Sequence, residues 1–289
     1  MTDFPLPGAA TPVVVAPAPG RGPQFWTGAP SAVLDGDTIV LGYRTRNGPD
    51  TTDETVIAVS DDGEHYETVL VLPQDHFGAQ WTERPALART EAGWRLWASC
   101  ATPNTKHWYI AVMEAPTLEA LADAEITVAF AGDADTAVKD PIIRRTGDGW
   151  AAWICCHLLD VPGAEDRMNT AYASSTDGWT WDWHGTVLEG APGTWSQRGA
   201  RLTTVLADGR AAYDARASEA ENWFERTGVT HWDGERFEAA GEPLADVRYL
   251  EVLPLPDGGY RIWYEARLDD ESHELRTELI SSTERGAAL

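Results

Sequence analysis

Short apolar runs separated by turns, rather than long helical stretches, dominate the hydrophobic pattern of this 289-residue chain. The stretch from Val138 to Cys156 is representative: an apolar pair, Ile142–Ile143, precedes a Gly-Asp-Gly turn, and a second apolar run begins at Trp150. Two apolar runs joined by a glycine-bounded turn are typical of a β-hairpin. A Lys-Asp-Pro step opens the unit, where proline costs no ladder hydrogen bond.

The same unit occurs five times along the chain. Its opening steps end near residues 30, 85, 141, 199 and 252, a period of about 55 residues. Second strands are predicted at Thr38–Tyr43, Trp94–Cys100, Trp150–Cys156, Arg210–Ala215 and Tyr260–Ala266. A third strand ends on a Ser-x-Asp-Gly turn, as at Ser60–Gly63 and Ser175–Gly178, and a fourth begins at the aromatic residue that follows. This pattern predicts an all-β, five-bladed β-propeller with four antiparallel strands per blade.

The last unit is short by one strand, because a sixth opening would fall beyond Leu289. Residues 11–17, Thr-Pro-Val-Val-Val-Ala-Pro, are predicted to supply the missing strand and close the ring, which would remove two open sheet edges. No linker or composition break interrupts the repeat, so residues 1–289 are expected to form a single domain.

Composition narrows the partners and the compartment. A net charge of −24 argues against binding nucleic acid or an anionic membrane surface. No apolar run approaches the ~20 residues of a membrane span, and the N-terminus has no signal-peptide pattern, so a cytoplasmic protein is expected.

Cysteine and metal chemistry add little to this picture. Cys100, Cys155 and Cys156 cannot form a disulfide framework and are predicted to be buried thiols. No residues have metal-ligand spacing, so neither a metal nor another cofactor is expected. No motif supports a cation in the channel near His157.

The first strand of each propeller blade lines the central channel, so the opening steps should meet at one mouth. The polar residues of these steps are Glu83, Arg84, Asp140, Arg198 and Glu251, whereas blade one has Ala29. Candidates at or near the same level, chiefly at the ends of the second strands, are Arg44, Arg46, Asp214, Arg216, Glu265, Arg201 and His157. Buried charge is costly unless it is paired or used, so this crowding indicates either a ligand site or a ring of ion pairs between blades.

Paired carboxylates are the groups that hydrolyse glycosidic bonds, one as acid and the other as base or nucleophile. If the site is functional, we expect Asp140 to be the base or an orienting residue, and Glu251 or Glu83 to be the general acid. The alternative is structural: Arg84 or Arg198 would pair with Asp140 or Glu251 and hold the blades in register.

Two further residue classes gather at the opening steps. Trp26, Trp81 and Trp195 lie beside them, and indole faces at a cleft rim stack on sugar rings. The arginines of the same region favour a locally positive mouth, suited to an acidic or phosphorylated sugar or to phosphate. The expected partner is a small carbohydrate.

The opening Lys139-Asp140-Pro141-Ile142-Ile143, with its glycine turn and aromatic second strand, resembles the five-bladed propeller glycoside hydrolases of families 43, 62, 32 and 68, and more distantly 117 and 130. The resemblance covers the whole repeat. In family 43, Asp-Pro steps in the first and third blades supply the base and a pKa-tuning aspartate, and a glutamate in the fourth supplies the acid. Asp140 fits the third-blade position, but Ala29 and Arg198 replace the other two carboxylates.

Three functions therefore stand at this stage. The first is a glycosidase that uses Asp140 with Glu251 or Glu83. The second is a non-catalytic carbohydrate-binding propeller, suggested by the two missing family 43 carboxylates. The third is a phosphate-using glycoside phosphorylase, suggested by the arginines and by the likeness of Glu83-Arg84-Pro85 to the second-blade step of family 130.

Overall fold

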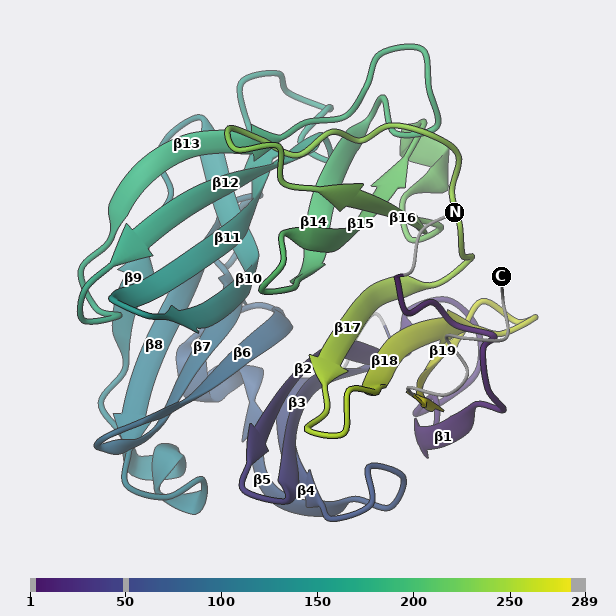
Figure 1. Cartoon of the computed structure of the whole chain (residues 1–289). Coiled ribbons are helices and arrows are strands. Elements are labelled where there is room, and N and C mark those ends of the chain that lie inside the picture. The colour runs from purple at the N-terminus through teal and green to yellow at the C-terminus, as the bar shows by residue number, and fades with distance from the viewer. Residues whose placement is uncertain (1–3, 49–51, 282–289) are drawn as a thin grey trace.

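The computed structural model describes residues 4–48 and 52–281, which form a ring of five antiparallel sheets around a common axis (Figure 1). Blade I contains β2 (Phe25–Asp35), β3 (Thr38–Asn47), β4 (Asp53–Ser60) and β5 (Glu67–Pro73). Blade II contains β6 (Thr82–Thr90), β7 (Gly93–Ala101), β8 (Trp108–Ala115) and β9 (Thr127–Phe130). Blade III contains β10 (Thr136–Thr146), β11 (Gly149–Leu158), β12 (Met168–Ser175) and β13 (Asp182–Leu188). The predicted five-bladed, all-β propeller is confirmed.

Blades IV and V complete the ring, with β14 (Gly199–Val205), β15 (Arg210–Arg216) and β16 (Arg226–His231), then β17 (Arg248–Pro254), β18 (Tyr260–Arg267) and β19 (His273–Ile280). Three short 3₁₀ turns connect strands at Gln74–Phe77, Glu119–Asp123 and Glu219–Glu221. Over the part of the chain that is described, no helix has the length and apolar character needed to cross a membrane.

The N-terminal strand closes the last blade, as the sequence predicts. β1 (Val13–Ala16) pairs antiparallel with β19, so that Val13 faces Thr277. Just before it, the backbone N–H groups of Gly8 and Ala10 donate to the carboxylate of Glu278 at 2.9 and 3.0 Å. The first residues of the propeller are thus fixed to its last strand, and the edge of β19 is covered.

Blade IV departs from the expected four strands. Beyond β16 its chain returns only through an isolated bridge between Thr227 and Ala245, and Leu244 N–H donates to Thr227 O at 2.8 Å. Pro243 lies in this returning segment and Gly241 has a φ of 83°. Proline has no N–H to give to a ladder, and a left-handed glycine bends the chain, so a regular fourth strand does not form.

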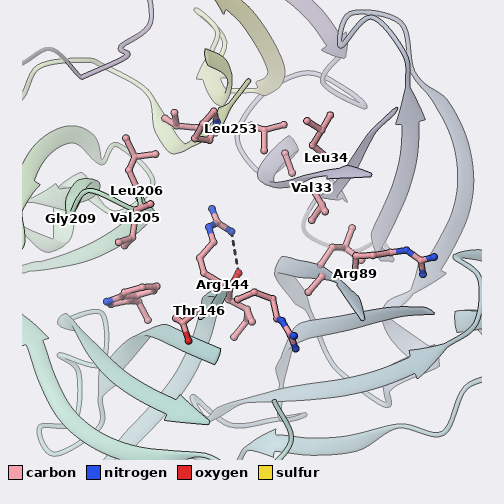
Figure 2. Close-up of a pocket in the computed structure, with 18 of the residues that line it drawn as sticks. Val33, Leu34, Arg89, Arg144, Thr146, Val205, Leu206, Gly209 and Leu253 are labelled. Carbon is pink, nitrogen blue, oxygen red and sulfur yellow. Dashed lines mark hydrogen bonds between the residues drawn. The ribbon is translucent and has the colours of Figure 1, made fainter. Parts of the chain in front are cut away.

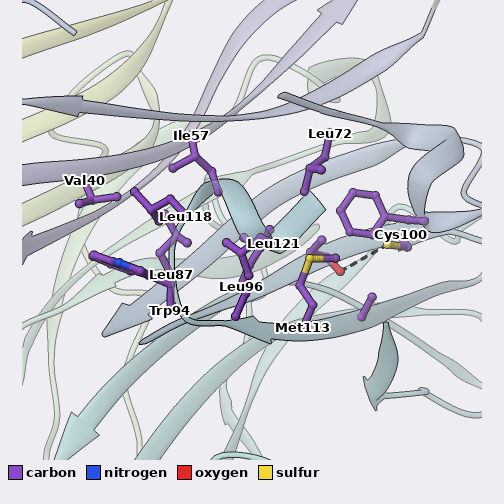
Figure 3. Packing of buried hydrophobic residues seen from close by; sticks show 14 of the residues in the cluster. Val40, Ile57, Leu72, Leu87, Trp94, Leu96, Cys100, Met113, Leu118 and Leu121 are labelled. Carbon is purple, nitrogen blue, oxygen red and sulfur yellow. Dashed lines mark hydrogen bonds between the residues drawn. The ribbon is translucent and has the colours of Figure 1, made fainter. Parts of the chain in front are cut away.

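Five hydrophobic clusters hold the ring together, one between each pair of neighbouring blades. The cluster between blades I and II includes Ile57 and Leu72 on one side and Leu96 and Met113 on the other (Figure 3). Corresponding clusters lie between II and III around Trp97, III and IV around Tyr213, IV and V around Leu250, and V and I around Trp263. Since each blade packs against two others, the five clusters close on themselves and fix the first strands around one axis.

The repeated Ser-x-Asp-Gly turn has a simple physical basis. In the first copy the Ser60 hydroxyl accepts the N–H of Gly63 at 2.8 Å, and Asp62 Oδ1 accepts the N–H groups of Glu64 and His65. Gly63 has a φ of 73°, and an added Cβ would lie 2.7 Å from the Arg261 side chain. The turn therefore needs both the side-chain acceptors and a glycine at its left-handed position.

Candidate functional site

A two-residue bulge in the first strand of four blades shapes one mouth of the channel. In blade III, Lys139 faces Cys155 and Ile142 faces Trp153, so two residues of β10 oppose the single residue Ile154. Equivalent bulges occupy Ala29–Pro30, Glu83–Arg84, Asp140–Pro141 and Tyr249–Leu250. A bulge turns a side chain out of the regular ladder and is common next to functional sites.

Three of these bulges begin with a strained residue. Ala29, Asp140 and Tyr249 have φ values of 54°, 51° and 52°, in the left-handed region that L-residues other than glycine rarely adopt. Such conformations persist only where the surroundings impose them, and they cluster at functional sites.

The bulges correct the register that was read from the sequence. Ala29, Glu83, Asp140 and Tyr249 are the equivalent positions, whereas the sequence reading placed Arg84 and Glu251 there. In blade IV the residue at the level of Lys139 is Arg201, which faces Asp214, whereas the sequence reading placed Gln197 there, so the predicted opening was four residues too early. The error arose because Pro30 and Pro141 belong to the bulge, while Pro85 follows it.

Two carboxylates from neighbouring blades meet at one hydroxyl. The phenolic oxygen of Tyr249 lies 3.2 Å from Asp140 Oδ2 and 3.4 Å from Glu83 Oε2. Arg201 Nη1 donates to the same hydroxyl at 2.8 Å and to Asp140 Oδ2 at 2.9 Å. A phenol carries one proton, so Glu83 and Asp140 compete for a single donor.

Buried hydrogen bonds hold these groups in place. The Ser99 hydroxyl accepts the N–H of Asp140 at 2.8 Å and donates to the carbonyl of Arg84 at 2.9 Å, which links the bulges of blades II and III. Asp214 Oδ2 accepts the N–H of Tyr249 and an N–H of Arg201, both at 2.8 Å. The strained backbone at Asp140 and Tyr249 is therefore anchored from two further blades.

Glu83 and Glu265 bind the arginines of blade I. Arg44 donates to Glu83 and to Glu265, each at 3.2 Å, and Arg46 joins Glu83 to Asp53. Glu265 also contacts the ring of His273 at 2.5 Å and Arg248 at 3.1 Å. A second cluster joins Arg248 and Arg216 through Glu225, and Arg216 reaches Asp166.

Every arginine that was expected to make this mouth positive has a carboxylate partner. Arg44, Arg46, Arg201 and Arg216 pair as above, Arg84 pairs with Glu251 at 2.8 Å, and Arg198 pairs with Asp166. The expectation of a positively charged mouth is therefore wrong, because the same blades that bring arginines also bring the acids that neutralise them. The alternative of ion pairs between blades is correct for Arg84 with Glu251, but Arg198 contacts neither Asp140 nor Glu251.

The cations decide which carboxylates are ionised. Burial opposes ionisation of Glu83, but its neighbours outweigh burial and hold its pKa well below the ordinary value; they are Arg44, Arg46, Lys139 and Arg248. In the same way, arginines overcome burial and lower the pKa of Glu225 and Glu265 to about 2. Burial raises the pKa of the Tyr249 phenol well above its usual range, so this group keeps its proton.

Several buried polar atoms of the site have no partner. Within the described residues these include Asp140 Oδ1, Arg44 Nη1 and Arg201 Nε. Lys139 Nζ lies 3.7 Å from the other oxygen, Asp140 Oδ2. Buried polar atoms normally have a hydrogen-bond partner, so the free Asp140 Oδ1 is an acceptor that a ligand or a water could occupy.

The three tryptophans that were predicted to stack on sugar rings differ in what surrounds them. Trp26 is only 1% exposed, since Trp223 packs on it edge-on and Arg46 and Arg248 lie over its ring. Trp195 is stacked on Tyr213 and donates its N–H to Gly241, so it belongs to the packing of blade IV. Trp81 is partly exposed, like Trp195, and Arg46 lies over its ring at 5.2 Å.

His157 lies at the expected level, at the end of β11. The residue is partly exposed. The partial burial of its ring and the nearby cations Lys139, Arg216 and Arg201 hold the pKa of His157 well below its ordinary value. No group of three or more His, Cys, Asp or Glu side chains that could hold a metal occurs among residues 4–48 and 52–281.

Glu251 does not join Asp140 at this mouth. Its side chain is fully buried deeper in the channel, where Oε2 accepts from Arg84 and Oε1 accepts from Arg144, both at 2.8 Å. Glu251 follows the bulge of blade V by one residue, so it points along the channel rather than out of the mouth.

Sequence reasoning missed Tyr249, Arg248, His273 and Glu225. The sequence did hold a signal for the first two. Arg248-Tyr249 precedes Tyr264-Glu265 in the second strand by 16 positions, and Lys139-Asp140 precedes Ile154-Cys155 by 15. An alignment of the blades on their second strands, instead of on the prolines, would have shown that Tyr249 occupies the position in blade V that Asp140 occupies in blade III. Glu225 had no signal, because it precedes β16 in a loop.

No protein-family model matches the chain, and no curated protein matches it in sequence. Solved structures do resemble it. A member of glycoside hydrolase family 130, the mannoside phosphorylases that contain hydrolases of β-1,2-mannosidic linkages in Candida mannan, is 15% identical with a TM-score of 0.61, and 96% of each chain is covered. A thermostable family 43 glycoside hydrolase is 11% identical over 88% of each chain, with a TM-score of 0.64.

A third similar structure is β-1,2-mannobiose phosphorylase from Listeria innocua in complex with β-1,2-mannobiose, at 11% identity and a TM-score of 0.63. The match covers 99% of this chain and 94% of that chain. At such identities the likeness establishes architecture alone. The chain has the five-bladed propeller fold that is shared by glycoside hydrolases and mannoside phosphorylases.

Proposed function

We propose that this protein is a carbohydrate-active enzyme that cleaves a glycosidic bond at the mouth formed by the bulges, with Glu83 and Asp140 as its pair of carboxylates. The observation that carries the proposal is their convergence on the Tyr249 hydroxyl from two different blades. Because both oxygens lie close to one atom, at 3.2 and 3.4 Å, they can be at most 6.6 Å apart, an upper limit that is compatible with the short separation of about 5–5.5 Å in retaining glycosidases. Asp140 was expected from the sequence to pair with Glu251 or Glu83, and the geometry favours Glu83.

The surroundings suggest a division of roles. Cations keep Glu83 ionised, which suits a base or nucleophile. Arg201 and Tyr249 hold Asp140 Oδ2, and only Oδ1 has no partner, so we assign Oδ1 as the atom that delivers the proton to the glycosidic oxygen. In the proposed reaction the leaving oxygen takes a proton from Asp140, and Glu83 either attacks the anomeric carbon or deprotonates the water that does. These roles reverse the ones expected from the sequence.

A small neutral glycoside fits the site better than an anionic one. Each arginine of the mouth already has a carboxylate partner, so an anion would have to compete with a buried acid for it. The same reasoning disfavours a phosphorylase that binds free phosphate here. Trp81 supplies an apolar face on which a sugar ring would stack.

The test begins with turnover of a panel of 2,4-dinitrophenyl and 4-nitrophenyl glycosides, with and without phosphate. Asp140→Ala should retain turnover of the dinitrophenyl substrate, whose leaving group needs no proton, and lose most turnover of the poorer one. Glu83→Ala should lose both, and azide should restore turnover by replacing the missing carboxylate. Equal loss on both substrates without azide rescue would refute the assigned roles. Release of sugar 1-phosphate only when phosphate is present would establish a phosphorylase instead.

A non-catalytic carbohydrate-binding propeller is the second candidate. It is supported by the completeness of the ion pairing around Glu83, and by the Tyr249 hydroxyl between the two carboxylates, where a substrate would have to enter. Measurable heats of sugar binding that Glu83→Gln abolishes, together with no turnover of any panel member, would favour this candidate.

A further inference from the structure

A cavity of about 930 Å³ opens at the other mouth of the channel, away from the bulges. It lies at the carboxyl ends of the first strands, and its walls are mostly apolar, with Val33 and Leu34 from blade I, Val205 and Leu206 from blade IV, and Leu253 from blade V (Figure 2). Small-molecule sites typically have this size and an apolar lining with a few polar groups.

The charged residues among those that line the cavity are all arginines. They are Arg89, Arg144 and Arg145, and none of the described lining residues is acidic. This is unexpected in a chain with a net charge of −24. Arg89 lies 3.5 Å from the half-exposed Asp35, and Arg145 lies over the Trp150 ring at 4.7 Å.

The floor of the cavity carries an excess positive charge. Arg144 projects into the middle of the space between the labelled side chains (Figure 2) and donates to Glu251. Glu251 is shared with the fully buried Arg84, whose other donors bond the backbone carbonyls of Pro30 and Thr203. Two guanidinium groups thus share one carboxylate, and a buried charge without compensation is costly.

We infer that this cavity binds a small amphipathic carboxylate, with its apolar body against the walls and its carboxylate on Arg144. A carboxylate there would supply the second negative charge that the Arg84–Glu251–Arg144 cluster lacks. An Arg–carboxylate pair is also a strong, directional hydrogen bond. The inference does not depend on the chemistry proposed for the opposite mouth.

Titration calorimetry with matched probes tests this. Octanoate should bind at least about tenfold more tightly than 1-octanol, because hydrogen bonds to charged groups contribute enough for such a factor. 2-Naphthoate and 2-naphthol form a second matched pair with an aromatic body. Equal affinity for acid and alcohol, or no heat with either acid at millimolar concentration, would overturn the proposal.

Three variants locate the site. Arg144→Gln should weaken octanoate binding about tenfold, and Val33→Trp should abolish it by filling the apolar end. Arg145→Gln should leave binding unchanged, because Arg145 extends from the other face of β10 onto Trp150. Val33→Trp changes no charge, so it keeps the test valid if Arg144→Gln unfolds the protein. Arg236, an exposed arginine outside the cavity, is the matched control.

The control must bind octanoate like the parent protein. If Arg236→Gln weakens binding as much as Arg144→Gln, the effect is general electrostatics and the site is refuted. The cavity could instead be covered by a second copy of the chain, which light scattering tests. A molecular mass that doubles with concentration in the parent protein, and stays monomeric in Val33→Trp, would overturn the small-ligand proposal.

Discussion

Replacing Glu251 with glutamine should destabilise the protein by about 3–5 kcal/mol, the usual cost of removing one partner of a buried ion pair. The carboxylate is fully buried and accepts hydrogen bonds from Arg84 and Arg144. Arg84 is 1% exposed and Glu251 is its carboxylate partner, so the variant leaves its charge buried without an anion. Arg144 is less affected, because its side chain is 28% exposed.

The assay is urea unfolding followed by tryptophan fluorescence, together with scanning calorimetry. At about 2–4 °C per kcal/mol for a chain of this order of size, the melting temperature should fall by roughly 6–20 °C. Glu238→Gln is the matched control, since Glu238 pairs with Arg236 at 3.9 Å and both side chains are 65% exposed. An exposed pair contributes at most about 1 kcal/mol, so this variant should melt within a few degrees of the parent.

The double variant Arg84→Met, Glu251→Leu separates charge from packing. Replacing both partners of a buried pair with apolar residues is often neutral or stabilising, so the double variant should recover most of the loss. A loss below about 1 kcal/mol in Glu251→Gln would refute the reasoning. So would a double variant that is no more stable than the single one, because the loss would then not come from the unpaired charge.

Three further predictions follow from the described residues. The pKa values of Glu225 and Glu265 in the folded protein are lowered to about 2, so the stability that these ionised carboxylates contribute is complete above pH 4.5 and is lost as the pH falls towards 2. The urea midpoint of unfolding should therefore fall between pH 4.5 and 2. A midpoint that does not change over this window would contradict the prediction. Burial raises the pKa of Cys155 to about 12, and all three cysteines are buried, so a thiol reagent should label three thiols in urea and none rapidly in the native state. Deleting residues 1–16 exposes the edge of β19 and removes the bonds to Glu278, so the variant should melt lower and scatter more light than the parent, whereas unchanged scattering would show that this edge needs no cover.

The repeat in the sequence was sufficient to predict the architecture because its signals are local. Glycine is required at left-handed turn positions such as Gly63, and the period of two in the strands directs alternate residues to the blade interfaces. Even the closing strand could be predicted, since a count of strands showed that one blade lacked its last member. Blade IV was the exception, because Pro243 and Gly241 interrupt a strand that the repeat alone would supply.

The candidate site was predicted only in part. Asp140, Glu83, Arg201 and Asp214 do meet at one mouth. Glu251 was misplaced because a shift of one or two residues in a strand moves a side chain to another depth and face, and the opening prolines gave no fixed register.

The sequence by itself determined the ring: turns, apolar alternation and a period of about 55 residues are properties of neighbouring residues. The tertiary structure decided the chemistry, because pairing between carboxylates and arginines depends on which residues from different blades reach the same depth. Glu83 and Tyr249 are 166 positions apart in the chain, yet their oxygens lie within 3.4 Å. Bulges and hydrogen bonds between blades set that distance, and no local pattern records it.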